Sequence, residues 1–141
     1  MGSSGGATLI LDTSILVDLL RGDETVQERI RAYEEAGEPL RTTAITAFEL
    51  YFGAYRSSHV KENLALVKSL LSSLEVLAFD EAGEITARIM ADLMERGKPL
   101  DVRDIFIAAI TMRMDEKLAT RDKDFMRAPL AILPIMPWSV R

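Results

Sequence analysis

The sequence predicts an α/β protein in which a mostly parallel sheet carries helices on both faces, in three layers. Short apolar runs alternate with amphipathic segments along the chain, and strands that alternate with helices form right-handed crossovers in a parallel sheet. No repeat, low-complexity tract or charge block divides the 141 residues, a length typical of one domain. We therefore expect a single domain over residues 8–141, preceded by a flexible start or tag remnant at residues 1–7.

In the amino-terminal half, apolar spacing and helix-ending residues define the elements. The run Thr8–Leu11 is short and apolar, and the segment after it, Ser14–Arg21, has its apolar residues at helical spacing. Gly22 ends this helix, and Gly37 with Pro39 ends the next. The elements expected in this half are the strand Thr8–Leu11, the helices Ser14–Arg21 and Asp23–Ala36, the strand Leu40–Ile45, and the helices Ala47–Arg56 and Ser58–Ser73.

The carboxyl-terminal half continues the alternation of strands and helices. Ile85, Ile89 and Leu93 recur on one side of a long helical segment that stops before Pro99. The elements expected here are the strand Glu75–Phe79, the helices Glu81–Arg96 and Val102–Met114, and the strands Lys117–Thr120 and Ala131–Ile135.

The residue types exclude several kinds of site. There is no cysteine, which excludes disulfides, thiolate zinc sites and a cysteine nucleophile, and the single His59 excludes catalysis by two histidines. Seventeen Lys and Arg against 22 Asp and Glu leave a net charge of −5, so binding to nucleic acid would need a local group of cations or bound metal ions. No apolar run approaches the ~20 residues of a membrane span, and we expect a cytoplasmic protein.

Four acidic residues are placed where one edge of the predicted sheet would gather them. Asp12 follows the first strand and Asp122 follows the fourth, whereas Glu49 and Asp104 each lie in the first turn of a helix. In parallel sheets, ligands bind beyond the carboxyl ends of the strands. The sequence therefore predicts that these four carboxylates converge at this edge.

Each acid also has a purely structural interpretation. Asp12 or Ser14 could cap the first helix, Asp104 could complement a helix dipole, and the segment Thr46–Glu49 matches the capping box. Their joint placement favours a metal site, because packed carboxylates repel one another unless a cation neutralises them. Carboxylate oxygens without His or Cys select Mg²⁺ or Mn²⁺.

Four short segments, in this order and spacing, resemble the PIN-domain ribonucleases, especially the VapC-type toxins of bacterial and archaeal toxin–antitoxin pairs. The resemblance extends from Leu9 to about Pro137 and implies a PIN-like three-layer fold with the acidic site at the strand carboxyl ends. The segments are Leu11–Ser14, Thr46–Leu50 with Gly53, Asp104–Ala109, and Thr120–Asp122 with Asp124 and Phe125.

The resemblance assigns roles to residues of this chain. The catalytic and metal-binding acids it implies are Asp12, Glu49, Asp104 and Asp122, with Asp124 as a further metal ligand. Ser14 and Thr120 would orient those carboxylates. Asp101, three residues before Asp104, remains an alternative ligand. The cations expected to contact RNA are Arg56, Arg121 and Lys123.

The activity implied is that of an endoribonuclease that cleaves single-stranded or looped RNA and requires Mg²⁺ or Mn²⁺. The resemblance also implies a homodimer and an antitoxin partner that covers the acidic site. An aromatic stripe, Phe48, Tyr51, Phe52 and Tyr55, is expected in the core, with a dimer or antitoxin surface as the alternative. The rival function is a catalytically inactive PIN-type module that binds RNA or protein, against which the presence of all four acids argues.

Overall fold

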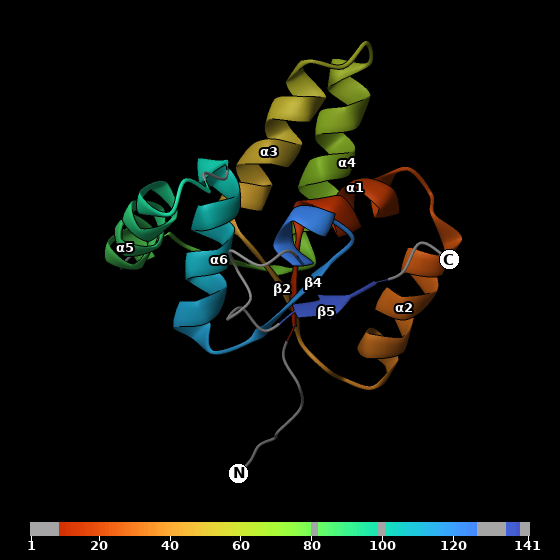
Figure 1. Ribbon diagram of the computed structural model, residues 1–141. Helices are drawn as coiled ribbons and strands as arrows, with labels where there is room; N and C mark the ends of the chain where they lie inside the picture. The colour runs from red at the N-terminus through yellow and green to blue at the C-terminus, as the bar shows by residue number, and fades with distance from the viewer. Residues whose placement is uncertain (1–8, 80–81, 99–100, 127–134, 139–141) are drawn as a thin grey trace.

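The computed structural model describes residues 9–79, 82–98, 101–126 and 135–138. Five parallel strands form one sheet in the order β3-β2-β1-β4-β5, and helices pack on both of its sides (Figure 1). The strands are β1 (Leu9–Leu11), β2 (Leu40–Thr43), β3 (Glu75–Leu77), β4 (Lys117–Thr120) and β5 (Ile135–Pro137). The predicted parallel α/β fold is confirmed.

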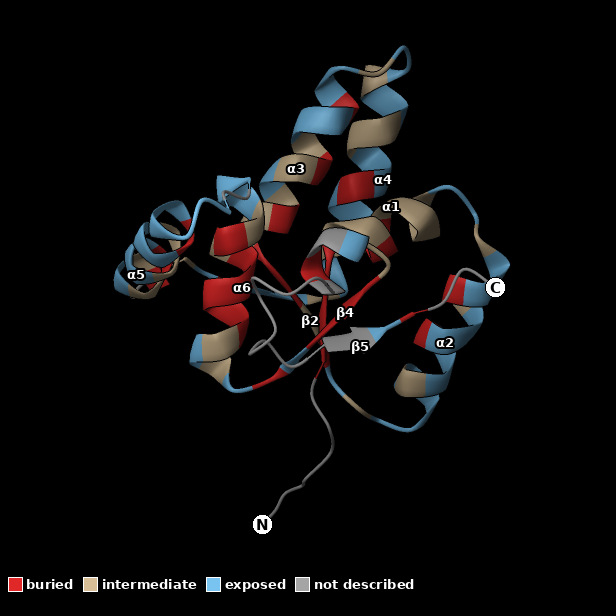
Figure 2. Cartoon of the chain, in the orientation of Figure 1, coloured by how far each residue is buried: buried red, intermediate tan, exposed pale blue. Residues whose placement is uncertain are grey.

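Successive residues of β1 face opposite layers, as the two-residue period of a strand requires. Leu9 and Leu11 pack into one core cluster with residues of α1 to α4, whereas Ile10 packs into a second cluster with α5 and α6. Both clusters contain fully buried side chains beside the sheet (Figure 2). The helices are α1 (Thr13–Leu20), α2 (Glu24–Glu35), α3 (Ala44–Tyr55), α4 (Val60–Ser72), α5 (Ala82–Glu95) and α6 (Val102–Met114).

The strand order places a topological switch point between β1 and β4. The chain runs from β1 outward through β2 to β3 and then returns to the other side of β1 as β4 and β5. In the register between these two strands, Leu11 is paired with Ala119. Asp12 and Asp122, which follow β1 and β4, therefore lie at the edge where α/β sheets bind ligands.

Most predicted elements appear with ends shifted by one or two residues, and two differ further. The second strand ends at Thr43 rather than Ile45, because the hydroxyl of Thr43 accepts a hydrogen bond from the Thr46 backbone N–H (3.1 Å) and starts α3 three residues early. The last strand is Ile135–Pro137, beyond the predicted 131–135. Residues 131–134 and the proposed flexible start at 1–7 lie outside the described residues.

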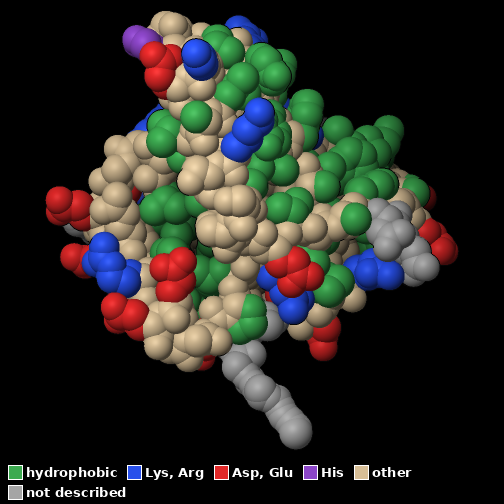
Figure 3. Space-filling view, turned by 180° about the vertical axis from the view of Figure 1, so that it is seen from behind, with side chains coloured by type: hydrophobic (Ala, Val, Ile, Leu, Met, Phe, Trp, Pro, Cys, Tyr) green, Lys and Arg blue, Asp and Glu red, His purple; other side chains and the backbone are tan. Residues whose placement is uncertain are grey.

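Helices α3 and α4 pack side by side and project from the sheet (Figure 1). Tyr51 packs partly against the core, but Phe48, Phe52 and Tyr55 are 53%, 46% and 65% exposed. The expectation that the whole stripe is buried is therefore wrong for these three rings. Hydrophobic side chains also gather in the upper half of the molecule when it is seen from behind (Figure 3).

None of the described helices has the length and apolar character needed to cross a membrane.

Candidate active site

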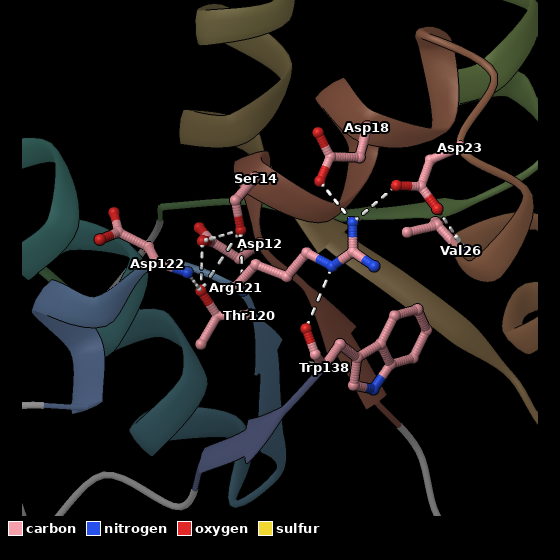
Figure 4. Close-up of polar contacts among 9 residues, drawn as sticks. All are labelled: Asp12, Ser14, Asp18, Asp23, Val26, Thr120, Arg121, Asp122 and Trp138. Carbon is pink, nitrogen blue, oxygen red and sulfur yellow. Dashed lines mark hydrogen bonds and ion pairs between the residues drawn. The ribbon is translucent and has the colours of Figure 1, made fainter. Parts of the chain in front are cut away.

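Asp12 is held at the switch point by hydroxyl groups. Its side chain is 2% exposed, and its Oδ2 accepts hydrogen bonds from Thr120 Oγ1 (2.7 Å) and Ser14 Oγ (3.0 Å) (Figure 4). Asp12 occupies the N-cap position of α1, yet its side chain makes no capping hydrogen bond. Burial raises the pKa of the Asp12 carboxyl and the Thr120 hydrogen bond opposes that rise. Asp12 is thus a buried, oriented carboxylate and does not cap its helix.

Thr120 and Ser14 connect the ends of two strands. The Thr120 hydroxyl accepts a hydrogen bond from the Asp122 backbone N–H (2.9 Å), and Ser14 Oγ accepts one from the Arg121 backbone N–H (3.0 Å). These bonds hold the turn after β4, which carries Asp122, beside the start of α1 (Figure 4). The supporting geometry expected of Ser14 and Thr120 is present, and the acid that they hold directly is Asp12.

Glu49 reaches the same edge from α3. The capping-box interpretation is wrong, because Thr43 caps this helix. Glu49 Oε1 instead accepts a hydrogen bond from Thr13 Oγ1 (2.6 Å), and its Oε2 lies 3.5 Å from Arg103 Nη1. The carboxylate therefore lies between the residue that follows Asp12 and the residue that precedes Asp104.

Asp104 is half-buried in the first turn of α6. Its pKa is raised to about 7, with burial as the largest cause, followed by repulsion from Asp122 and then from Asp12. A carboxylate whose role was to complement the helix dipole would have a lowered pKa. Asp122 and Asp12 are therefore close enough to Asp104 to oppose its ionisation.

Asp101 has a different role from its neighbour Asp104. Its carboxylate caps α6 by accepting a hydrogen bond from the Arg103 backbone N–H (2.9 Å), and it pairs with the Arg103 guanidinium through Nε (3.1 Å) and Nη2 (2.8 Å). These bonds hold the pKa of the exposed Asp101 carboxyl below its usual range. Of the two acids that the sequence offered, Asp101 is the cap and Asp104 is the member of the acidic group.

Comparison with known proteins adds the family to this geometry. A family model for the PIN domain matches residues 9–130. The chain belongs to the PIN-domain family. The tRNA(fMet)-specific endonuclease VapC of Salmonella typhimurium is 33% identical over 101 residues, which cover 70% of this chain and 74% of that protein. Ribonuclease VapC2 of Haemophilus influenzae is 29% identical over 101 residues, or 71% and 75% of the two chains. These relatives place the chain among the VapC-type PIN proteins.

A solved structure agrees with the sequence relatives. The crystal structure of DNA-bound VapBC from Salmonella typhimurium matches with a TM-score of 0.83 at 29% identity, covering 94% of this chain and 99% of that one. The structure of FitAB bound to a DNA fragment matches with a TM-score of 0.71 at 25% identity, covering 92% and 94%. The three-layer PIN fold therefore extends over nearly the whole chain.

The donor set of this PIN site fits Mg²⁺ or Mn²⁺, because carboxylate oxygens are the ligands these ions prefer. The pKa of Asp104 is raised mainly by burial, and repulsion from neighbouring carboxylates, which a bound cation would offset, adds to the rise. Within the described part of the chain, however, no three acidic side chains are arranged to hold an ion together. The Glu49 carboxylate contacts Thr13 through Oε1 and Arg103 through Oε2. The side chain of Asp124, the further ligand expected, lies outside the described residues.

The expectation that Arg121 contacts RNA is corrected by its position in the PIN domain. Its side chain is 5% exposed, and Nη1 lies 2.7 Å from Asp18 Oδ2 and 2.9 Å from Asp23 Oδ2. Nε donates to the carbonyl oxygen of Trp138 (3.1 Å), so the guanidinium extends away from the acids toward α1 and α2 (Figure 4). A buried guanidinium with three protein partners is a structural link and is not available to a phosphate.

The other two cations remain accessible. Arg56 is exposed at the end of α3, where its guanidinium lies 5.7 Å from the centre of the Phe52 ring. Lys123 is exposed in the short 3₁₀ turn Lys123–Met126 that follows Asp122.

Sequence reasoning missed Arg103 and Thr13, the two partners of Glu49. Each directly adjoins one of the predicted acids, and Arg103 also lies in the first turn of α6, which Asp101 caps. A basic residue between two acids in a helical first turn was the available signal, but its partner lies 54 residues away in the chain.

Proposed function

We propose that this VapC-type PIN protein is a metal-dependent endoribonuclease that cleaves single-stranded or looped RNA. The observation that carries the proposal is the buried Asp12 carboxylate at the switch point of the sheet, held by hydrogen bonds from Thr120 and Ser14. The pKa of nearby Asp104 is raised by burial and by repulsion from Asp122 and Asp12, which is consistent with a group of acids at this edge. Evolutionary relatives named as ribonucleases and tRNA(fMet)-specific endonucleases support this substrate class, and tRNA is the first RNA to test. Asp12, Glu49, Asp104 and Asp122 are the acids that would hold Mg²⁺ or Mn²⁺.

Bound divalent ions supply activated water and offset the charge that develops on the phosphate. The chain contributes the positions of the ligands. Thr120 and Ser14 hold Asp12 by hydrogen bonds to one carboxylate oxygen, and Thr120 fixes the turn of Asp122. Asp104 projects from a helix whose N-terminus is capped by Asp101. Positions fixed on strand ends and helix starts keep the acids in place for repeated turnover.

RNA must bind despite the net charge of −5. Arg56 lies two helical turns from Glu49 on α3, about 10 Å along the axis, and Lys123 follows Asp122 directly. We propose these two exposed cations as phosphate contacts.

We also propose an antitoxin partner and a homodimer. A solved relative from Mycobacterium tuberculosis is described as a member of the VapBC family of toxin–antitoxin systems, which supports a partner protein. A cavity of about 290 Å³ between α1, α3 and α4 has apolar walls that include Leu50 and Val67 and reaches Glu49. The exposed rings of Phe48, Phe52 and Tyr55 on α3 form a second apolar surface, which we propose as the contact between two copies of the chain. Phe52→Glu should shift the protein toward monomer in sedimentation velocity, and an unchanged dimer would exclude this face.

The decisive experiment compares Asp12→Asn with the parent on defined RNAs, including tRNA, in Mg²⁺, Mn²⁺ and EDTA. The substitution removes an ionised oxygen at nearly constant volume, so cleavage should fall by at least about 100-fold with an unchanged circular dichroism spectrum. Asp115→Asn is the matched control, because this exposed aspartate lies at the other end of α6.

Three results would contradict the proposal. They are parental cleavage in EDTA, Asp12→Asn activity within about tenfold of the parent, and no cleavage of any RNA by a parent that still binds RNA. The last would favour an inactive RNA-binding module of the PIN type.

A further inference from the structure

Arg103 places a positive charge at the mouth of the acidic site. Its side chain is 45% exposed, and it follows the N-cap of α6 and precedes Asp104. Nε and Nη2 bind the two carboxylate oxygens of Asp101, at 3.1 and 2.8 Å. The remaining nitrogen, Nη1, lies 3.5 Å from Glu49 Oε2. The guanidinium therefore has a fixed anchor and one nitrogen left for Glu49.

Both carboxylate oxygens of Glu49 have a protein partner in this arrangement. Oε1 accepts the Thr13 hydroxyl hydrogen bond at 2.6 Å, and Oε2 faces Arg103. Among the described residues, no three acids are gathered to hold an ion. To bind an ion shared with the other acids, Glu49 would have to exchange one of these two contacts for the ion.

We propose that Arg103 is a positioning residue that holds Glu49 away from the metal site of the metal-free protein, so that a divalent cation must take Glu49 from it. This inference rests on the proposed metal-dependent function. It assigns Arg103 two opposing effects, because its charge offsets repulsion among the acids when no ion is bound and opposes the ion when one arrives.

The geometry makes such an exchange feasible. At 3.5 Å the Glu49 contact is longer than a hydrogen bond of normal strength. The contact to Asp101 is shorter and uses two nitrogens, so Arg103 can stay anchored while Glu49 moves. The exposed pair should be screened by salt, and the effect of Arg103 on metal affinity should therefore decrease as ionic strength rises.

The test titrates Mn²⁺ into the parent and into Arg103→Gln, with calorimetry and the Mn²⁺ electron paramagnetic resonance signal as readouts independent of cleavage. We expect the Mn²⁺ dissociation constant to fall by about three- to tenfold in Arg103→Gln, with the largest gain at low salt. In EDTA the same variant should melt at a lower temperature than the parent. A residue that only stabilises the fold would not tighten metal binding.

Arg96→Gln is the matched control for charge. Arg96 pairs with Asp92 on α5 at 2.6 Å and is exposed, so this variant changes the net charge equally without touching the site. Its Mn²⁺ affinity should equal that of the parent. A second control repeats Arg103→Gln in a Glu49→Gln background. The gain in Mn²⁺ affinity should disappear there, because the carboxylate for which Arg103 and the ion compete is gone.

Several outcomes would overturn the inference. They are an unchanged or weaker Mn²⁺ affinity in Arg103→Gln, an equal gain in affinity in Arg96→Gln, and a gain that persists in the Glu49→Gln background. The last result would mean that the charge of Arg103 acts on the ion directly and not through Glu49. The proposed function fails separately if the parent does not bind Mn²⁺, or if Asp104→Asn binds it as tightly as the parent, and either result overturns the inference too.

Discussion

Thr120 donates a hydrogen bond from Oγ1 to Asp12 Oδ2 at 2.7 Å, across 108 positions of the sequence. The same hydroxyl oxygen accepts the backbone N–H of Asp122 at 2.9 Å. One fully buried side chain thus orients one acid and fixes the turn that carries another. This relationship connects β1 and β4 at the switch point of the sheet, where the candidate active site lies.

Thr120→Val should damage both stability and activity. The valine fills the same space but leaves the Asp12 carboxylate and the Asp122 N–H each short of a partner, which costs about 1–3 kcal/mol of unfolding free energy. The Thr120 hydrogen bond lowers the pKa of Asp12, so its loss should move the acid limb of the activity profile to higher pH. Denaturant unfolding and a pH–rate series measure the two effects.

Thr111→Val is the control for Thr120→Val. Thr111 is also fully buried, but its hydroxyl donates only to the carbonyl oxygen of Ile107 in its own helix (2.8 Å). This variant should leave the pH profile unchanged. An identical shift in both variants would contradict a specific role for Thr120.

The acids should destabilise the metal-free protein as pH rises. The pKa of Asp104 in the folded state is about 7, against an ordinary value of 3.8, so the folded state binds more protons than the unfolded state between these values. Stability must therefore fall from about pH 4 to pH 7. After allowance for solvent screening, the loss due to this half-buried group is about 1 kcal/mol. Thermal melting in EDTA across this range measures it.

Asp104→Asn should remove most of that pH dependence and melt higher than the parent at pH 8 in EDTA. Mn²⁺ should stabilise the parent by about 2.7 kcal/mol when the free ion reaches 100 times its dissociation constant, and this gain should shrink sharply in the variant. A variant that melts lower in EDTA and gains as much from Mn²⁺ as the parent would mean that Asp104 only supports its helix.

Arg56→Ala should weaken RNA binding to a similar degree for all sequences. Loss of one phosphate contact lowers the slope of log affinity against log salt by about one. Arg31→Ala, which removes an exposed arginine from α2, is the control and should leave the slope unchanged. Fluorescence anisotropy at several salt concentrations distinguishes the two, and an unchanged slope for Arg56→Ala would remove this residue from the RNA surface.

Arg121→Gln should act on stability and leave the salt slope alone. Without the guanidinium, Asp18 and Asp23 lose the charge that pairs them, and the carbonyl oxygen of Trp138 loses a donor. We expect the melting temperature to fall by on the order of 5–10 °C, with or without metal. A parental melting temperature combined with a smaller salt slope would restore Arg121 as an RNA contact.

Local pattern was sufficient for the order and type of the elements. Helical and strand periodicities report which face of a segment is apolar, and Gly22 and Gly37, with φ of 85° and 74°, end helices where the sequence predicted. The start of α3 was misplaced because Thr43 and Thr46 are both acceptable caps by sequence. The hydrogen bond between them, seen only in the folded backbone, selects Thr43.

The sequence by itself determined which acids are available and that parallel strands would bring Asp12 and Asp122 to one edge. Tertiary structure alone decided what each charged group contacts. Asp101 became a cap and Asp104 a member of the acidic group, Arg121 was buried with Asp18, and Arg103 was directed to Glu49. The physical reason is that burial raises the pKa of Asp104, and that Glu49 and Asp18 lie 54 and 103 residues from the arginines they contact. Periodicity and capping patterns describe interactions within about one helical turn, so they could not supply these partners.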